Sequence, residues 1–586
     1  KKPMQDKLMR RLKIQETINR TIPDLEYEED EITKRKNQLK EMASNKYVGY
    51  GDAIKASIKT SEERDSWLKD IALNAEQILG EEGYADKFVD YMSRGWYSLS
   101  SPVWSNFGLD RGLPISCFGS YIGDSVQSIM YTVAEVGMMS KYGGGTSGYF
   151  GDVRGRGESI TDNGKSNGTP PFAKMFDTTI DVISQGNTRR GYFAGYIDIE
   201  HRDILEWLEF LTEGNPVQLM YYGVCVGNDW LAEMKAGDSQ KRMVWAKILQ
   251  MRAEVGVPYI LFKDNVNENT VDVYKDKGMT IYASNLCSEI ALPSNINESF
   301  VCCLSSMNAL HFDDWRDTNA VEVLTKFLDA VMSEFITKTA KLPFMERAHN
   351  FAKRHRALGL GVLGWHDLLQ YKGIAFDSFE AMQLNVRLFR TIQTQSLLAS
   401  QHMAAVYGEP EVLKGYGRRN TTLTAVAPTK SSSFILGQVS QSIEPHKSNY
   451  YVRDTAKMKV TYRNPALKIV LQKHDADLET VWKSIGEHDG SVQHLDFLTD
   501  HEREVFKTMS EISQLAIIQQ AASRQKYIDQ SQSLNIMIHP KTPTKDINKL
   551  YLTAAELGVK SLYYQYSVNA AQEFNRELLD CSSCGA

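Results

Sequence analysis

The sequence predicts an α/β fold, because short apolar stretches typical of strands alternate with amphipathic helices along most of its 586 residues. The clearest example lies near the C-terminus, where residues 533–538, 544–558 and 559–566 have the patterns of strand, helix and strand. Such a unit requires parallel strands joined by a right-handed crossover. The length suits several domains or one large barrel with appendages, and no internal repeat is present.

Composition excludes several classes of protein. Hydrophobic residues make up 42% and charged residues 24%, and the formal net charge of −6 argues against a nucleic-acid-binding surface. No apolar run reaches the roughly 20 residues of a membrane span, and the polar N-terminus does not have the pattern of a signal peptide. The seven cysteines are odd in number and widely scattered, which favours reduced thiols. We therefore expect a cytoplasmic protein that binds neither nucleic acid nor membrane.

Several segments between the apolar stretches have the sequence patterns of helices. Residues 1–97 contain charged helical patterns, and a helix is expected to begin at Asp124 or Ser125, either of which can act as its N-cap. The stretch 98–108 is predicted to be extended. Further helices are expected at 201–211, 319–339 and 377–407, the last ended by Gly408.

The stretch 284–290, SNLCSEI, carries the most unusual chemistry. If this segment is extended, Asn285, Cys287 and Glu289 share one side-chain direction. A buried strand has no use for an unpaired carboxylate, whereas an amide, a thiol and a carboxylate together suit a reactive site. The alternative is a half-exposed strand with one ordinary buried cysteine.

Two cysteines, Cys581 and Cys584, form a CxxC near the C-terminus. This spacing suits a reversible disulfide or half of a zinc site. Zinc is disfavoured because no second CxxC or histidine pair completes four ligands, and the adjacent Cys302 and Cys303 are badly spaced. A dithiol that delivers electrons is the remaining interpretation, and no metal site is predicted.

Three other motifs have two interpretations each. PTKSSS at 428–433 follows an alternating stretch and can cradle a phosphate, or it can be a capped turn without a ligand. GLGVLG at 359–364 fits a dinucleotide-binding pattern but follows a basic helix, so close packing of backbones is favoured. Tyr563 and Tyr564, taken alone, are typical of a strand in a core.

Taken together, these motifs resemble the catalytic large subunit of ribonucleotide reductase, most closely class I, from about Ser98 to the C-terminus. The family's N-x-C-x-E motif is matched by Asn285, Cys287 and Glu289. The resemblance implies a ten-stranded α/β barrel of two half-barrels over residues 98–566. It also implies an N-terminal helical region over 1–97 without an ATP-cone, and a flexible tail over 567–586 with the redox CxxC.

The resemblance also implies roles for the central residues. Cys287 would become a thiyl radical that takes the 3′ hydrogen of a ribose, Glu289 would be the general base, and Asn285 would hold the sugar hydroxyls. Base and radical must reach adjacent ribose positions, because deprotonating one hydroxyl helps the neighbouring one to leave as water. The product is a deoxyribonucleotide for DNA synthesis.

Further thiols would supply the two electrons. Cys117 matches the family's first reducing cysteine and Cys302 the second, with Cys303 as the rival for that role. Exchange with the pair Cys581 and Cys584 would reduce the resulting disulfide, and thioredoxin or glutaredoxin would then reduce the tail. Cys225 matches no catalytic position and is expected in the core.

Substrate and radical contacts follow from the same resemblance. Tyr563 and Tyr564 match a radical-transfer pair fed by a metal-containing small (beta) subunit, although neighbours on a regular strand point to opposite faces. Lys430 departs from the acidic or uncharged residue expected at its position. The substrate-binding positions are Ser101, Ser116, Thr429, Lys430, Ser431 and Ser432.

Asp124, Ser125 and Arg154 match the region that binds a deoxynucleoside triphosphate or ATP effector, together with the glycine- and arginine-rich loops at 154–157 and 185–195. A homodimer formed through helices beside these loops is implied, with no cofactor bound in this chain. Two alternatives fit the same motifs in part: an adenosylcobalamin-dependent reductase of the same barrel family, and a catalytically silent nucleotide-binding regulator. The tyrosine pair argues against the first, and the retained cysteine and glutamate argue against the second.

Overall fold

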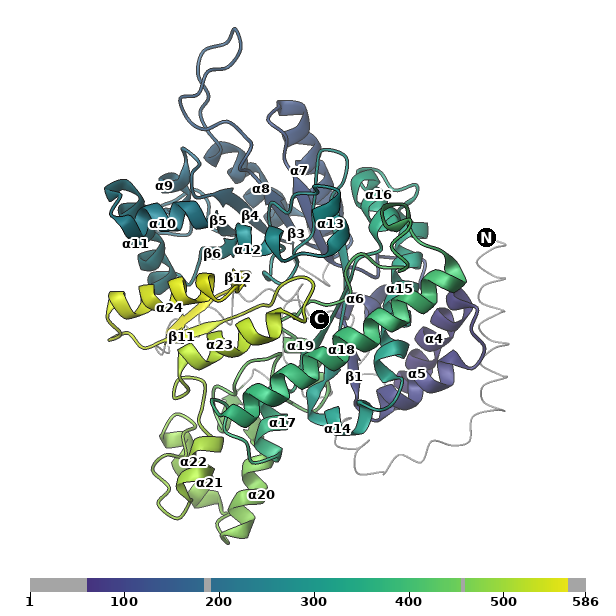
Figure 1. Ribbon diagram of the computed structural model, residues 1–586, viewed down its shortest axis with the longest axis vertical. Coiled ribbons are helices and arrows are strands. Elements are labelled where there is room, and N and C mark those ends of the chain that lie inside the picture. The colour runs from purple at the N-terminus through teal and green to yellow at the C-terminus, as the bar shows by residue number, and fades with distance from the viewer. Residues whose placement is uncertain (1–60, 184–190, 455–458, 568–586) are drawn as a thin grey trace.

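The computed structural model describes residues 61–183, 191–454 and 459–567 (Figure 1). Its main sheet begins with five parallel strands in sequence order, which form the first half of a barrel. All but the end residues of these strands are buried, as expected where both faces of a parallel sheet are covered. The strands are β2 (Cys117–Tyr121), β3 (Gly145–Tyr149), β4 (Tyr192–Asp198), β5 (Tyr221–Val226) and β6 (Tyr259–Phe262).

The second half of the barrel is also parallel within itself. Strand β7 (Phe300–Asn308) pairs with β8 (Leu358–Leu363), and parallel bridges then join Leu360 to Thr424 and Val426 to Gln532. The last strand of this half-barrel is β12 (Ser561–Leu562). It is followed by β13 (Gln565–Ser567), which pairs with β11 (Ile536–Ile538).

Where the two halves meet, their strands pair antiparallel: β2 pairs with β7, and β6 pairs with β12. Two of the ten barrel members, the segments around Thr424 and Gln532, are held by single bridges and are not regular strands. The predicted α/β barrel of two half-barrels is therefore confirmed. The parallel pairing of β11 with β13 across α24 (Thr544–Glu556) also confirms the C-terminal strand–helix–strand unit.

Helices cover the outside of the barrel (Figure 1). The predicted helices at 319–339 and 377–407 are confirmed, and Gly408 ends the second with a positive φ of 90°. The main covering helices are α7 (Val126–Lys141), α8 (Pro170–Val182), α10 (Asn228–Ala236), α11 (Ser239–Glu254), α15 (Ala320–Thr339), α16 (Glu346–His355), α18 (Phe379–Tyr407) and α23 (Gln514–Gln525).

The described N-terminal helices, α4 (Ser61–Leu79) and α5 (Tyr84–Ser93), pack into the same hydrophobic core as the barrel. Phe88 of α5 stacks on Phe327 of α15 with ring centroids 4.5 Å apart. A short strand, β1 (Tyr97–Leu99), then pairs antiparallel with β7. The expectation for residues 1–60 lies outside the described residues, and the predicted boundaries at 97 and 567 stay predictions.

A lobe from about residue 449 to 508 projects beside the barrel, at the lower end of Figure 1. It has a small hydrophobic core of its own, in which Trp482 is fully buried. Its elements are β9 (Tyr450–Asp454), β10 (Lys459–Arg463), α20 (Pro465–Lys473), α21 (Glu479–Glu487) and α22 (Asp500–Val505).

Two local predictions were wrong. Residues 98–108 were expected to be extended, but helix α6 (Ser101–Asn106) forms within them, because Pro102 lies in the first turn where its missing N–H is not needed. The amphipathic helix expected at 201–211 is only the four residues of α9 (Ile204–Trp207). Leu211 adopts a left-handed conformation with φ 64°, which a continuing helix does not allow.

Gly359 and Gly361 of GLGVLG lie in β8 and permit close backbone packing, and Gly364 follows the strand with a left-handed φ of 74°. A Cβ at Gly359 would come 2.4 Å from Leu304 Cδ2, and one at Gly361 would come 2.4 Å from the Ala425 carbonyl oxygen. Packing therefore explains this motif, as predicted. Within the described parts of the chain, no helix has both the length and the apolar character needed to cross a membrane.

Candidate active site

The segment 284–290 is a buried turn inside the barrel, and not the extended strand on which the alternation argument depended. Ser288 adopts a left-handed conformation with φ 66°, so the turn, not a two-residue period, sets where the three side chains lie. The Tyr196 hydroxyl donates to the Asn285 carbonyl oxygen at 2.7 Å, and Ser147 donates to that of Ser284 at 2.8 Å. Strands β3 and β4 therefore fix this turn from the first half-barrel.

Glu289 is fully buried, and burial raises its pKa to about 7. Hydrogen bonds from the side chains of Asn285 and Ser533 oppose this rise, and Ser533 Oγ lies 3.3 Å from Glu289 Oε2. The other carboxylate oxygen, Oε1, has no hydrogen-bond partner among the described residues. A buried carboxylate with one open oxygen and a pKa near neutrality can accept a proton from a bound group.

Cys117 and Cys302 lie directly opposite each other where β2 pairs with β7. Opposed residues in an antiparallel pair have Cα atoms about 4.5–5.5 Å apart, which lies within the range that a disulfide spans. Asn285 Nδ2 lies 4.0 Å from Cys117 Sγ, so the pair adjoins the 284–290 turn. Cys303 pairs instead with Leu358 of β8, and as the next residue on the strand it faces the opposite side from Cys302.

Sequence reasoning missed residues 529–533, DQSQS, which contact Cys302, Cys287 and Glu289. Gln530 Nε2 lies 3.3 Å from Cys302 Sγ, and the Ser531 amide donates to the Glu289 carbonyl oxygen at 2.9 Å. Ser533 Oγ donates to the Cys287 carbonyl oxygen at 2.5 Å as well as contacting Glu289. The available signal was a run of five polar residues that leads into the predicted strand 533–538, where a core segment should be apolar.

Tyr563 and Tyr564 occupy the break between β12 and β13. The break removes the strict alternation of a strand, so their rings come together with centroids 4.3 Å apart. Tyr259 of β6 joins them, since its hydroxyl lies 3.1 Å from that of Tyr564. The buried Arg252 donates to the Tyr563 carbonyl oxygen at 2.7 Å and fixes the backbone at the break.

The residues predicted to bind substrate come from three segments. Thr429, with a left-handed φ of 54°, precedes the short helix α19 (Lys430–Ile435), and its Oγ1 accepts from the Ser442 amide at 2.8 Å. Ser432 Oγ lies 3.4 Å from the carbonyl oxygen of Leu99, two residues before Ser101. The buried Ser431 hydroxyl has no partner among the described residues. Ser101 and Ser116 are both buried, on α6 and just before β2.

Of the residues predicted to bind an effector, Asp124 and Ser125 directly precede α7, and Arg154 reaches Asp124 from the loop after β3. Arg154 Nε lies 3.0 Å from Asp124 Oδ2, and the Arg154 amide donates to Asp124 Oδ1 at 3.1 Å. Ser125 is the N-cap of α7, as predicted, and its Oγ accepts from the Ser128 amide. Part of the second effector loop, 184–190, lies outside the described residues, as do Cys581 and Cys584. The described residues contain no cluster of side chains suited to a metal ion.

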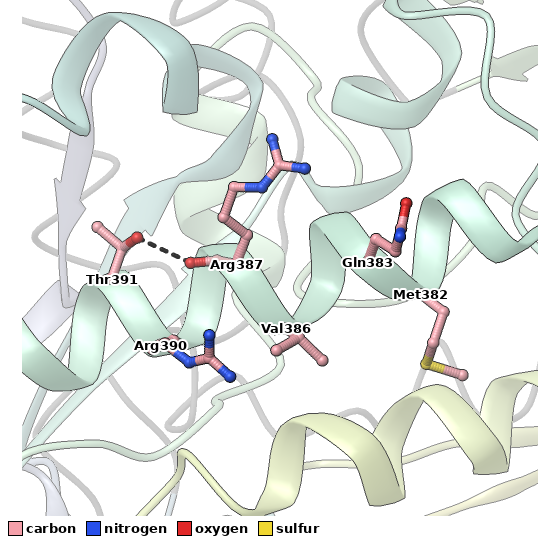
Figure 2. Close-up of a pocket in the computed structure, with 6 residues that line it drawn as sticks. All are labelled: Met382, Gln383, Val386, Arg387, Arg390 and Thr391. Atoms are coloured by element: carbon pink, nitrogen blue, oxygen red, sulfur yellow. Dashed lines mark hydrogen bonds between the residues drawn. The ribbon is translucent and has the colours of Figure 1, made fainter.

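A surface cavity of about 470 Å³ lies elsewhere, along helix α18 (Figure 2). Arg390 donates to the Tyr527 hydroxyl at 2.9 Å, and Thr391 donates to the Arg387 carbonyl oxygen at 2.8 Å. None of the site residues described above lines it. The lining residues are Met382, Gln383, Val386, Arg387, Arg390 and Thr391.

The fold and the site define an α/β barrel enzyme that brings cysteines, a carboxylate and an amide together in its buried interior. The family model for the barrel domain of ribonucleotide reductase matches residues 115–243, 232–415 and 410–565. The chain therefore belongs to the ribonucleotide reductase family. It is an enzyme of the ribonucleoside-diphosphate reductase large-subunit type.

Individual relatives support the same family assignment. The chain is 62% identical to the class Id ribonucleotide reductase alpha subunit of Actinobacillus ureae, with a TM-score of 0.84 over 96% of this chain and 100% of that one. A large-subunit homologue from Frog virus 3 (isolate Goorha) is 37% identical over 83% of this chain and 88% of its own length. The large subunit of Invertebrate iridescent virus 3 is 33% identical over 86% and 92%. These matches favour neither a cobalamin-dependent enzyme nor a silent homologue.

Proposed function

We propose that this chain reduces ribonucleoside diphosphates to deoxyribonucleotides, with Cys287 as the radical-bearing residue. The observation that carries the proposal is the meeting, inside the barrel, of the Asn285, Cys287 and Glu289 turn with the opposed pair Cys117 and Cys302. Radical chemistry and a two-electron reductant must reach one sugar, and this arrangement offers both within one closed space.

In the proposed reaction the Cys287 thiyl radical takes the 3′ hydrogen of the ribose. Glu289 takes the proton of the 3′ hydroxyl, which assists loss of the 2′ hydroxyl as water, and the Asn285 amide holds the hydroxyls. Cys117 and Cys302 then supply two electrons and two protons, one proton for the departing water and one for C2′, and become a disulfide. The 3′ hydrogen returns from Cys287, and Glu289 gives the proton back to the 3′ oxygen. The open Oε1 of Glu289 and its pKa of about 7 suit this proton transfer near neutral pH.

The radical would come from a metal-containing small (beta) subunit through Tyr564 and Tyr563. The contact between the two rings, and the hydroxyl of Tyr259 next to Tyr564, support a path for an electron and a proton. No cofactor is proposed to be bound in this chain itself. The pair Cys581 and Cys584 would reduce the Cys117–Cys302 disulfide and be reduced in turn by thioredoxin or glutaredoxin. A cytoplasmic location follows from this thiol chemistry, which needs a reducing compartment.

Nucleotides would bind at two places. The hydroxyls and backbone amides around 429–432, with Lys430, Ser101 and Ser116, would hold the substrate diphosphate, supported by the meeting of Ser432 with the segment before α6. Asp124, Ser125 and Arg154 would bind a deoxynucleoside triphosphate or ATP as effector.

Two copies of the chain would associate through the helices beside the effector site. Val126 and Met130 of α7 and Val182 at the end of α8 are exposed apolar residues, which suits a homodimer. Light scattering with and without a deoxynucleoside triphosphate tests this assembly.

The activity is tested by supplying the purified chain with a class I small subunit, a dithiol and a ribonucleoside diphosphate, and by measuring the deoxy product. We expect turnover that depends on the small subunit and is abolished by Cys287→Ser. Cys225→Ser is the matched control, because Cys225 is an equally buried cysteine whose Sγ lies 3.3 Å from the Tyr282 carbonyl oxygen. Equal loss in both variants, or turnover by Cys287→Ser, would contradict the proposed role.

A further inference from the structure

Three tyrosines contact one another at the carboxyl ends of β2 and β3. The rings of Tyr149 and Tyr282 stack with centroids 5.1 Å apart, and the Tyr121 ring lies 5.2 Å from that of Tyr282. Tyr149 is the last residue of β3 and is buried, whereas Tyr121, the last residue of β2, and Tyr282 are half-buried. The cluster therefore runs from the barrel wall toward the surface.

Tyr196 joins this cluster to the turn that carries Cys287. Its hydroxyl donates at 2.7 Å to the carbonyl oxygen of Asn285, two residues before Cys287. Tyr196 is also the partner of Tyr149 in the register of β4 with β3. Paired residues of neighbouring strands share one face of the sheet, and the strands lie about 4.8 Å apart. A series of four phenols therefore leads from the turn to the surface, in the order Tyr196, Tyr149, Tyr282 and Tyr121.

A proton acceptor stands at the surface end of this series. The Tyr121 hydroxyl donates to the carboxylate of Asp152, which is exposed. A phenol that donates to a carboxylate can pass its proton there when its electron leaves. Inside the barrel, burial raises the pKa of Tyr196 and of Tyr149, so these phenols lose a proton only together with an electron. The series therefore favours oxidation at its outer end, on Tyr121.

We propose that these four phenols form an exit route, through which an oxidising equivalent that Cys287 has not used on a ribose reaches the surface and is quenched by a thiol in solution. The inference rests on the proposed function for its radical. That function already requires a hydrogen atom to pass between Tyr563 and Cys287, so exchange of Cys287 with a second tyrosine has a similar energy. A ribose held at the turn reacts first, because the Tyr196 hydrogen must leave its bond to the Asn285 carbonyl oxygen.

The inner steps of the route move one electron and one proton together. The Cys287 thiyl radical takes a hydrogen atom from the Tyr196 hydroxyl and becomes a thiol. Tyr149 then gives a hydrogen atom to the Tyr196 phenoxyl radical, and Tyr282 gives one to Tyr149. The radical then lies on Tyr282, which is half-buried and within reach of solvent.

The electron and the proton separate at the surface. The Tyr282 radical takes an electron from Tyr121 and a proton from solvent, while the Tyr121 proton passes to Asp152. A thiol then gives an electron to the Tyr121 radical and a proton to solvent, and Asp152 returns its proton. Two thiyl radicals formed from the solution thiol couple to a disulfide, in which the oxidising equivalents leave the protein.

The route is tested with 3-aminotyrosine in place of Tyr121, since this amino acid is oxidised more easily than tyrosine and holds a radical long enough for EPR spectroscopy. The full chain is mixed with a class I small subunit, a deoxynucleoside triphosphate and a ribonucleoside diphosphate, without added thiol, and is then frozen. We expect an aminotyrosyl radical that requires the small subunit. The signal should be lost when the same chain also carries Cys287→Ser or Tyr196→Phe.

Two further positions of the trap serve as controls. Tyr416 is also half-buried and donates to the carboxylate of the exposed Asp276 at 2.8 Å, but its ring contacts Arg418, so we expect no radical there. A trap in place of Tyr564 reports entry of the radical. A radical at 564 without one at 121 would overturn the exit route alone, whereas no radical at 564 would count against the proposed function.

Tyr149→Phe keeps the test decisive if Tyr196→Phe disturbs the turn or the fold, which a thermal melt of each variant reveals. It interrupts the route one strand further from the turn and keeps the bond from Tyr196 to Asn285. We expect the radical at 121 to be lost, while the deoxy product still forms. A radical at 121 that persists in Tyr149→Phe or in Cys287→Ser, or an equal radical at 416, would overturn the proposal.

Discussion

The barrel centre and the lobe of residues 449–508 shift the pKa of a carboxylate in opposite directions. In the lobe, burial acts against the charge of Glu502, but hydrogen bonds from the Thr499 backbone and from His474 outweigh it and lower its pKa. In the barrel, burial dominates and raises the pKa of Glu289, which keeps one oxygen without a partner among the described residues. The charged form of Glu502 therefore stabilises the lobe, whereas Glu289 in the barrel keeps an oxygen that can accept a proton from a bound group.

The largest expected effect is a loss of turnover when Glu289, but not Glu502, is replaced. Glu289→Gln should lower kcat by about 10²–10⁴-fold, since it removes a general base. The same change should stabilise the fold above pH 7. The folded-state pKa of about 7 exceeds the ordinary value of 4.5, so the folded protein binds the proton more tightly, and stability falls as pH rises between these values. The shift corresponds to about 3 kcal/mol of unfolding free energy.

Urea unfolding at pH 5 and pH 8 measures this effect, with turnover assayed on the same samples. Glu502→Gln is the control and should lose stability at pH 8, because the lowered pKa means that its charged form supports the fold. Equal stability changes in the two variants at pH 8 would remove the contrast between the regions.

The next effect concerns the small core of the lobe. Trp482 is fully buried and donates from Nε1 to Asp477 Oδ1 at 2.8 Å, so Trp482→Ala should cost about 3–5 kcal/mol of unfolding free energy. Phe497→Ala is the control, since Phe497 is 41% exposed and its loss should change stability by about 0.5 kcal/mol or less. Thermal melts measure both, and similar shifts in the two variants would show that Trp482 does not organise the lobe.

A smaller effect is expected at Ser533, which donates to the Cys287 carbonyl oxygen and contacts the Glu289 carboxylate. Its hydrogen bond lowers the pKa of Glu289 against the larger effect of burial, so Ser533→Ala should move the acidic limb of the kcat–pH profile upward from about pH 7. Ser491→Ala in the lobe, where Ser491 donates to Glu511, is the control. A profile that keeps its midpoint would show that Ser533 does not act on Glu289.

The smallest stability effect is expected at the exposed pair Arg154 and Asp124. Their side chains are 33% and 36% exposed, so Arg154→Ala should change stability by less than about 1 kcal/mol. Effector binding should nevertheless weaken clearly, which calorimetric titration with a deoxynucleoside triphosphate measures. Arg94→Ala, which breaks another exposed pair with Asp90, should leave effector binding unchanged. Equal effector affinity in both variants would remove Arg154 from the proposed effector site.

Periodicity predicted the regular elements well, because helix α18 and the β11–α24–β13 unit follow apolar patterns and have clear end signals. It failed at 201–211, where the left-handed Leu211 ends an otherwise helical pattern. The barrel itself was predicted through a resemblance. Strand alternation alone could not reveal that Thr424 and Gln532 join the barrel by single bridges.

The residues of the site were selected from sequence, but their geometry was not. The alternation of side chains along a strand predicted that Asn285, Cys287 and Glu289 share one face, whereas the left-handed Ser288 makes the segment a turn. Tyr563 and Tyr564 could meet only at a strand break, and the break is present. Gln530 could not be found by motif, because its contact with Cys302 joins residues 228 positions apart in the sequence.

The most direct test of the proposed function asks where the radical comes from. Product formation from a ribonucleoside diphosphate is measured with a dithiol and either a class I small subunit or adenosylcobalamin alone, for the parent chain and for Tyr564→Phe. We expect product only with the small subunit and none from Tyr564→Phe, which removes the hydroxyl that contacts Tyr259 but keeps the ring and its buried position. Product with adenosylcobalamin alone, or undiminished turnover by Tyr564→Phe, would contradict a radical that enters through the tyrosine pair.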